Sequence, residues 1–256
     1  MKSLDRAIDL LLCFQTHAQL SVDEIAERVG WPRSSVYRFT RILKERGFLT
    51  YLPESKRYAL GPVLYELGRQ GGPDLGEIAR PVLGRLAKET SETSFLSVRI
   101  GREAKYAACV ESTESIRFTA PIGKQFPLYA GASAKVILAF MEEEERKRYL
   151  KSVRLKRLCK STILDKSRLE RALSVIRSRG YDFTQEELYR GAWGLAAPVF
   201  NEEGVAIASL AVTGVVFRPP EEKLPRFISL VRAAAEEVTE KLRRSQGEAM
   251  KARRTG

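Results

Sequence analysis

Two short helical patterns lie only a few residues apart near the start of the chain, and this spacing constrains the fold more than any other feature. In the first, Ser21 and Glu24 have the S-x-x-E pattern of a capping box, and apolar side chains follow at helical spacing. Gly30 marks its end, and Pro32 fits the first turn of a second helix that stops at Gly47. Two helices joined by so tight a turn are typical of a helix-turn-helix.

The second helix, within residues 31–46, separates apolar from polar side chains. At about 100° per residue, Val36, Phe39 and Leu43 fall on one side, with Ile42 at its margin. The other side carries donors and cations, which a helix in the DNA major groove needs for base edges and phosphates. The start of such a helix usually meets the bases. The candidates for base contact are Arg33, Ser34, Ser35, Tyr37 and Arg38, and those for phosphate contact are Arg41 and Lys44. The alternative is a surface helix whose charges are merely solvated.

Two strand patterns, at residues 48–52 and 57–61, flank a polar turn directly after this helix. A hairpin in that position is the wing of a winged helix, so we predict a winged helix-turn-helix that binds double-stranded DNA. Lys56 and Arg57 at the tip of the wing are placed to reach backbone phosphate or the minor groove. A solvent-exposed turn without DNA contacts is the alternative interpretation of the tip.

The positive charge of the chain is not concentrated in this region. The net charge of the 256 residues is +12, but residues 1–72 hold eleven Lys and Arg against eight Asp and Glu, a net of +3. Residues 146–160 hold eight cations and no acid, which indicates either a second nucleic-acid patch or pairing with the preceding acidic run at 142–145. The local pattern of the second helix therefore supports DNA binding better than total charge does.

Several classes of protein are disfavoured by what the sequence contains. Three widely spaced cysteines and a single histidine, His17, argue against a disulfide framework, a zinc site and histidine-based catalysis. Ser133 and Lys135 are two positions apart on a predicted helix, so they do not share a face. We therefore predict no enzyme, no cofactor and no metal. No apolar run reaches the roughly 18 residues of a membrane span, and we expect a cytoplasmic protein without a signal peptide.

The rest of the chain predicts an α+β domain, because runs of strands alternate with groups of helices. We expect a winged helix-turn-helix at 1–61, a helical linker at 62–74 ending near Gly71-Gly72-Pro73, a large domain at 75–244 and a disordered basic tail at 245–256. The helices expected in the large domain cover 75–89, 132–141, 142–151, 166–179 and 221–244. The expected strands cover 94–100, 104–110, 116–120, 195–200 and 205–216.

Several stretches resemble the IclR family of bacterial transcriptional regulators. The first are residues 25–38 and 57–61, in which Trp31 stands where that family more often has leucine. Residues 126–139 resemble its proline-leucine segment and the helix that follows, and its second motif is matched by 180–183, 186–187, Gly191 and 195–199. The resemblance implies a GAF-like α/β effector-binding domain, a homodimer or tetramer on a palindromic operator, and control of operons for small-molecule metabolism. An activator would also contact RNA polymerase.

The same resemblance implies an effector pocket formed by Gly131, Ala132, Thr184, Gly194, Ala211 and Thr213. Backbone N–H groups at the start of a helix, here Gly131 and Ala132, suit a carboxylate. Relatives that bind small oxo-acids tend to have an acidic residue, cysteine and serines at the other positions, so this chain has lost polarity there. We expect a larger, more apolar pocket for a larger or aromatic organic acid, with Phe126, Tyr129 or Trp193 lining it.

Two alternatives to effector binding remain at this point. The three aromatic side chains are equally consistent with an ordinary core, and the large domain could serve only for oligomerisation. In that case the protein binds DNA as an architectural or constitutive factor without an effector. A regulator should release its operator when an effector is added, whereas an architectural protein should bind DNA without sequence preference and without such a response.

Overall fold

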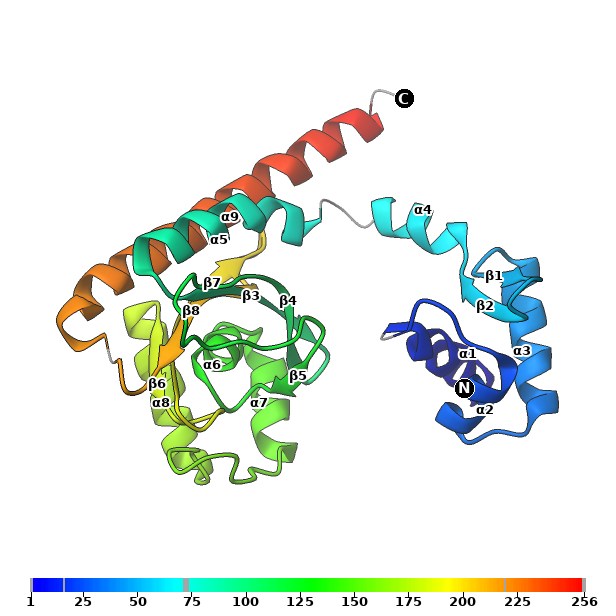
Figure 1. Cartoon of the computed structure of the whole chain (residues 1–256). Helices are drawn as coiled ribbons and strands as arrows, with labels where there is room; N and C mark the ends of the chain where they lie inside the picture. Colours follow the sequence, from blue (N-terminus) through cyan, green and yellow to red (C-terminus); the bar gives the residue numbers. More distant parts are fainter. Residues whose placement is uncertain (1, 16, 71–73, 219, 255–256) are drawn as a thin grey trace. The chain divides into compact units, whose positions relative to one another are not determined.

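The computed structural model describes residues 2–15, 17–70, 74–218 and 220–254. The chain divides into two compact units, Met1–Gly72 and Pro73–Gly256 (Figure 1). The predicted boundary Gly71-Gly72-Pro73 lies outside the described residues. Each unit has its own hydrophobic interior.

The first unit combines a helical core with a small hairpin. Ser21 and Glu24 form the predicted capping box, in which Ser21 Oγ accepts from the Glu24 amide at 3.2 Å and the Glu24 carboxylate accepts from the Ser21 amide at 2.8 Å. Gly30 follows the last turn at φ 67°, a left-handed conformation that glycine adopts without strain. The elements of this unit are α1 (Lys2–Leu12), a 3₁₀ turn (Cys13–Gln15), α2 (Val22–Val29), α3 (Arg33–Glu45), β1 (Leu49–Leu52), β2 (Arg57–Leu60) and α4 (Pro62–Gln70).

The hairpin is attached to the helical core at both ends. β1 and β2 pair antiparallel, and Tyr58 of β2 also exchanges two backbone hydrogen bonds with Leu20 before α2. At the base of the hairpin a Cβ atom on Gly61 would lie 2.1 Å from the Gly47 carbonyl oxygen, so only glycine fits. The side chains buried beneath are Leu10, Phe14, Leu20, Val22, Ile25, Val36, Phe39, Leu43, Leu49 and Tyr58.

The second unit is built on one six-stranded antiparallel sheet. Its strand order is β5-β4-β3-β8-β7-β6, in which β3 pairs with β8 across a long sequence separation. The strands are β3 (Thr93–Ile100), β4 (Glu103–Val110), β5 (Gln125–Pro127), β6 (Asp182–Gln185), β7 (Ala192–Phe200) and β8 (Ala206–Val215). The helices are α5 (Leu75–Thr90), α6 (Ala132–Ala139), α7 (Glu143–Ser152), α8 (Lys166–Arg179) and α9 (Leu224–Arg254), the last preceded by a 3₁₀ turn (Glu221–Lys223).

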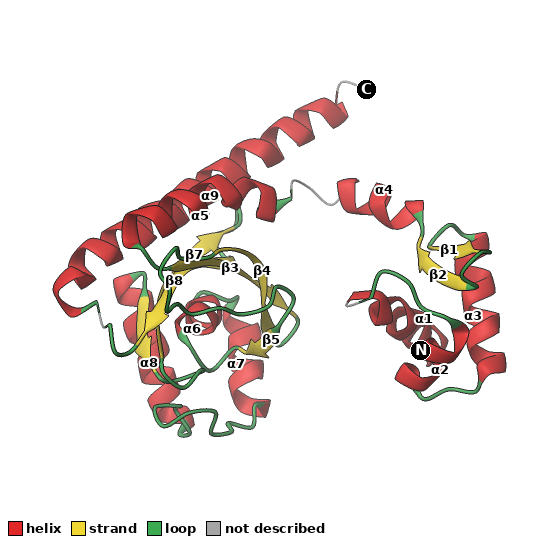
Figure 2. Ribbon diagram, viewed as in Figure 1, coloured by secondary structure: helices red, strands yellow, loops and turns green. Residues whose placement is uncertain are grey.

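Helices cover both faces of this sheet (Figure 2). α5 and α9 lie side by side on one face, where Leu83, Leu210 and Val231 belong to one buried cluster. α6, α7 and α8 lie on the other face, and α6 sits in the curl of the sheet with Ile137 fully buried. The alternation of side chains along β7 and β8 serves both clusters, so neighbouring residues on one strand face different helices.

The predicted fold class is confirmed, with a helix-turn-helix unit followed by an α/β unit. Two predictions about elements are wrong: residues 116–120 form no strand, and the tail expected to be disordered from 245 is helical to Arg254 as the end of α9. The sequence patterns also did not indicate β5 and β6. Within the described ranges, no helix is long and apolar enough to cross a membrane, and no group of three or more His, Cys, Asp or Glu could hold a metal ion.

Candidate functional site

The polar face of α3 is exposed in the way the sequence predicts. Val36, Phe39 and Leu43 are buried, whereas Ile42 is 47% and Tyr37 is 57% exposed. The other exposed positions on α3 that we expected to contact DNA are Arg33, Ser34, Arg38, Arg41 and Lys44; Ser35 is half-buried. The helix thus presents a surface of hydroxyl, phenol and cationic groups, the types that bind base edges and phosphates.

Intramolecular contacts distinguish among these cations. Arg33 forms an ion pair with Asp23 of α2, and Arg41 lies 3.7 Å from Glu45 one turn further along α3. Arg38 instead places its guanidinium 5.6 Å from the centre of the Phe39 ring. No ion pair joins Arg38 or Lys44 to any residue in the described part of the chain.

The two cations at the tip of the wing differ. Lys56 is exposed and lies in the turn at φ 53°. Arg57 is half-buried, donates to the Gln19 carbonyl at 3.2 Å and pairs with Glu24 at 3.0 Å. The backbone amide of Ser21, assisted by Arg57, holds the pKa of Glu24 below its usual range. Arg57 would have to leave Glu24 of α2 before it could contact DNA, so its contact with DNA stays a prediction.

Most of the predicted effector residues converge on one small cavity. Gly131 and Ala132 begin α6, Thr184 lies on β6, Gly194 on β7 and Thr213 on β8, and all five line a cavity of about 30 Å³. A Cβ atom on Gly194 would lie 3.8 Å from Ala132 Cβ, 3.8 Å from Thr213 Oγ1 and 3.9 Å from Thr184 Oγ1. Such a volume holds about two water molecules, so the larger pocket that we expected is not present in this conformation.

The remaining predicted residues lie elsewhere or face away. Ala211 belongs to the buried core beside the cavity, and Phe126 stacks behind Tyr106 with ring centres 4.6 Å apart. Tyr129 accepts from the Lys156 amide and donates to its carbonyl, both at 3.2 Å. Trp193 forms part of the cavity wall, but its ring packs against Phe227 of α9 on the opposite face of the sheet. Phe126 and Tyr129 are therefore not among the residues that line the cavity, whereas Trp193 is, and its contact with an effector stays a prediction.

A buried ion cluster that sequence reasoning missed reaches the cavity through Glu187. Lys135 Nζ on α6 lies 3.1 Å from Asp182 Oδ2 and 2.8 Å from Glu187 Oε2, and the three side chains are 6%, 12% and 3% exposed. Glu187 Oε2 also accepts from the Gly131 amide at 3.3 Å, which is the amide expected to hold an effector carboxylate. Only one signal could have found the cluster, a single charge at 135 within the otherwise apolar segment 134–139.

Electrostatics in this cluster follow from its burial. Burial raises the pKa of Asp182 and of Glu187, although the ammonium group of Lys135 opposes the change. Burial also acts to lower the pKa of Lys135, but the two carboxylates outweigh it and the pKa is raised. Lys135 therefore stays charged, and the cluster carries one net negative charge when both acids are ionised.

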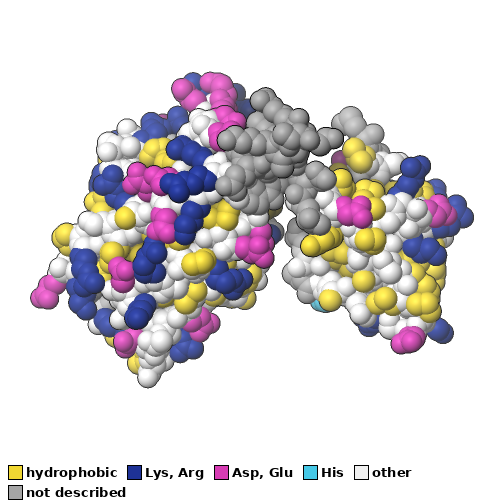
Figure 3. Space-filling model, turned by 90° about the horizontal axis from the view of Figure 1, so that it is seen from above, with side chains coloured by type: hydrophobic (Ala, Val, Ile, Leu, Met, Phe, Trp, Pro, Cys, Tyr) yellow, Lys and Arg dark blue, Asp and Glu magenta, His cyan; other side chains and the backbone are white. Residues whose placement is uncertain are grey.

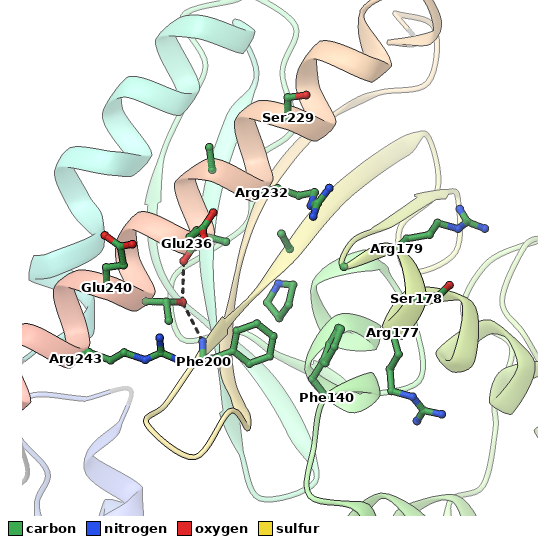
Figure 4. Close-up of a pocket in the computed structure, with 16 residues that line it drawn as sticks. Phe140, Arg177, Ser178, Arg179, Phe200, Ser229, Arg232, Glu236, Glu240 and Arg243 are labelled. Carbon is green, nitrogen blue, oxygen red and sulfur yellow. Dashed lines mark hydrogen bonds between the residues drawn. The ribbon is translucent and has the colours of Figure 1, made fainter.

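A larger and more open groove lies on the outside of the second unit, between α8, α9 and β7 (Figure 4). Its volume is about 650 Å³, and it is lined by Arg232 and Glu236 of α9 and by Phe140 and Phe200. These two rings pack edge to face at 5.2 Å. No buried polar atom that lacks a partner belongs to a residue of this groove in the described chain, so nothing there indicates a specific ligand.

Comparison with known proteins covers both units. Residues 3–53 match the IclR helix-turn-helix domain, and residues 71–240 match the C-terminal domain of the bacterial transcriptional regulator IclR. The HTH-type transcriptional regulator KipR of Bacillus subtilis is 33% identical over 243 residues, which cover 94% of this chain and 97% of KipR. The crystal structure of Thermotoga maritima IclR is 34% identical, with a TM-score of 0.64, and the match covers 94% of this chain and 99% of that one. An IclR regulator from Alicyclobacillus acidocaldarius is 28% identical, with a TM-score of 0.76 and coverage of 94% and 98%.

Proposed function

Since this chain belongs to the IclR family of bacterial transcriptional regulators, we propose that it represses or activates a catabolic operon under the control of a small organic-acid effector. Family membership makes it a regulator with a DNA-binding helix-turn-helix and a C-terminal effector domain, and not an enzyme. The operon, the chemical class of the effector and the residues that contact each ligand belong to the proposal.

DNA reading is assigned to the exposed face of α3. Arg38 is the main candidate for a base contact, because it lies in the first half of the helix and forms no ion pair within the described chain. Ser34, Ser35 and Tyr37 lie beside it, whereas Arg41, Lys44 and Lys56 suit phosphate. Arg33 would have to leave Asp23 before it could contact DNA.

Effector binding is assigned to the cavity around Gly194. The observation that supports it best is convergence: Ala132 of α6, Thr184 of β6 and Thr213 of β8 all lie within 4 Å of where a Cβ atom on Gly194 of β7 would be. A ligand larger than the cavity requires the wall to move, and such movement is a means by which a bound effector shifts the protein between two states.

Assembly and location complete the proposal. A helix-turn-helix protein usually reads two half-sites as a dimer, so we expect a homodimer or tetramer on a palindromic operator in the cytoplasm. If the protein activates transcription, it also contacts RNA polymerase. Sedimentation of the full chain with and without operator DNA measures this stoichiometry.

The DNA assignment is tested by replacing Arg38. Arg38→Ala should weaken binding to the operator by about 1–3 kcal/mol and leave binding to unrelated DNA almost unchanged, because a base contact is lost. Fluorescence anisotropy on both DNAs measures the difference. Arg157→Ala, an exposed cation of the second unit, is the control and should change neither affinity. Unchanged operator affinity in Arg38→Ala would exclude α3 from base reading.

The effector assignment is tested by filling the cavity. The Cβ atom of Gly194→Ala would meet its neighbours at ordinary contact distance, so the variant should fold normally while occupying the binding space. In a thermal-shift screen of organic acids, an effector should raise the Tm of the wild type but not of Gly194→Ala. Gly84→Ala on α5, with nothing within 4 Å of its added Cβ, should keep the shift. If no acid raises the wild-type Tm and none releases operator DNA, the protein acts without an effector.

A further inference from the structure

One wall of the effector cavity contains a polar atom with no partner. Glu187 Oε1 and Tyr189 Oη are buried atoms without a hydrogen-bond partner among the described residues, and both residues line the cavity. Glu187 is 3% exposed, so bulk water does not solvate its carboxylate. Buried polar groups in folded proteins are nearly always hydrogen-bonded, because an unpaired one is costly.

The chain cannot supply the missing partner by turning the Glu187 side chain. Its other oxygen, Oε2, is held by Lys135 Nζ at 2.8 Å and by the Gly131 amide at 3.3 Å. The backbone is fixed too, since the Glu187 carbonyl accepts from Thr162 Oγ1 at 2.8 Å. Rotating the carboxylate to satisfy Oε1 would break these contacts. A molecule bound in the cavity that Glu187 lines can supply a donor for Oε1.

Burial raises the pKa of Glu187, and the two donors at Oε2 act against that rise. An ammonium and an amide N–H both stabilise the ionised carboxylate, which leaves Oε1 as an acceptor. A carboxylate of the ligand is repelled from this wall by the like charge of Glu187. The hydroxyl groups of Thr184, Tyr189 and Thr213 elsewhere in the cavity are able to donate to such a carboxylate.

We propose that the effector presents a hydroxyl group to Glu187 Oε1 and is a small aliphatic hydroxy acid, which makes Glu187 the residue that determines specificity. The inference rests on the proposed effector function of the cavity around Gly194. It replaces the aromatic acid that the sequence indicated, because Phe126 and Tyr129 do not line the cavity and the Trp193 ring packs against Phe227. With a volume of about 30 Å³, the cavity must widen even for a three-carbon acid.

Lactate and pyruvate are the matched probes. At the second carbon, lactate carries a hydroxyl group, which can donate, and pyruvate carries a carbonyl group, which can only accept. Calorimetric titration of the full chain should show lactate binding at least about tenfold more tightly than pyruvate, as expected for a hydrogen bond to a charged group. Glycolate should likewise bind more tightly than acetate. Equal affinities within either pair would overturn the proposal. Tighter binding of pyruvate would also overturn it, because the pyruvate carbonyl would then need a hydrogen-bond donor on Glu187.

Replacing Glu187 tests the residue itself. In Glu187→Gln the amide oxygen can remain with Lys135 and Gly131 while its NH₂ group faces the cavity, so the preference should reverse toward pyruvate. Glu186→Gln is the adjacent control, because Glu186 pairs with Lys160 and with the Gly191 amide instead. A preference for lactate that persists in Glu187→Gln would overturn the assignment. If that variant does not fold, the wild-type ratios decide alone.

The failures of the two proposals are distinguishable. If pyruvate binds the wild type as well as lactate does and Gly194→Ala abolishes both, the effector site stands and the donor requirement falls. If none of the four acids binds, the hydroxy-acid proposal falls. Other compounds are then tested for release of operator DNA from the wild type and from Gly194→Ala. A compound that releases the wild type but not Gly194→Ala would support the cavity as an effector site.

Discussion

At the scale of single residues, Lys135 has the most unusual environment in the second unit. It lies on α6 amid apolar neighbours and is 4% exposed, yet it carries a charge that two carboxylates neutralise. Taking three charges out of water costs more than an apolar replacement of the whole cluster would. The cluster joins α6, β6 and the loop after β6, which form walls of the cavity around Gly194.

Replacing Lys135 alone should therefore be costly. Lys135→Met leaves Asp182 and Glu187 buried without a cation, and we expect the free energy of unfolding to fall by about 3–5 kcal/mol. Urea denaturation of the full chain, followed by far-UV circular dichroism, measures the loss. Lys147→Met on α7 removes a cation that pairs with Glu143 and Glu144 at the surface, and should leave the midpoint unchanged. Equal midpoints for Lys135→Met and the wild type would refute the structural role.

The loss in Lys135→Met should also depend on pH. Without the ammonium, the pKa values of Asp182 and Glu187 rise further above their ordinary values of 3.8 and 4.5. A carboxyl whose pKa is raised by folding binds its proton more tightly in the folded state, so stability increases as the pH falls through the raised pKa. The difference from the wild type should shrink between pH 8 and pH 5. A difference that grows toward acid would contradict this account.

At the scale of elements, the capping box before α2 stabilises the first half of the helix-turn-helix. Ser21→Ala removes the acceptor for the Glu24 amide and should destabilise the first unit by about 1 kcal/mol. Hydrogen exchange measured by mass spectrometry should show faster exchange in α2 and α3 and no change in the second unit. Ser34→Ala is the complementary variant: we expect it to weaken DNA binding without altering exchange. Unaltered hydrogen exchange in Ser21→Ala would mean that the capping box does not stabilise the first unit.

Elements with a local signal were predictable from the sequence. α8 occupies the predicted residues 166–179, and α2 begins after the predicted cap Ser21 and ends before the predicted stop Gly30. Residues 116–120 alternate like a strand, but Ile116 is 61% exposed, and Phe118 packs edge to face on Phe95 instead. Alternation alone cannot provide a neighbouring strand to pair with. α9 continues past 244 because the polar residues there are good helix formers.

The cavity around Gly194, which we propose as the effector site, was predictable only in part, for a related reason. The resemblance pointed to Thr184, Gly194 and Thr213, which do meet, because homologous positions keep their places in the sheet. It could not indicate which way Trp193 faces, since that depends on the alternation of β7 between two helical layers. Nor could it reveal that Glu187 reaches across to α6, because the contact spans 52 positions from Lys135 and has no local pattern.

At the scale of the whole molecule, the charge of +12 is spread over both units and does not mark the DNA surface. On the face shown in Figure 3, Lys and Arg side chains are interspersed with Asp and Glu over the larger unit. Several cations of the second unit have acidic partners, such as Arg99 with Glu145 at 2.6 Å and Arg218 with Glu92 at 3.0 Å. DNA affinity should accordingly depend on a few cations of the first unit rather than on the total.

The salt dependence of operator binding tests this distribution of charge. Each phosphate contact that is lost makes the plot of log K against log salt shallower by about one for each bound copy, because one fewer counterion is released. Lys44→Gln should have this effect, and Arg41→Gln should add to it. The double variant Arg154→Gln/Lys156→Gln removes the same amount of charge from an exposed loop of the second unit and should leave the slope unchanged. If Arg41→Gln/Lys44→Gln and Arg154→Gln/Lys156→Gln changed the salt slope equally, the overall positive charge would bind DNA, and α3 would have no special role in contacting phosphate.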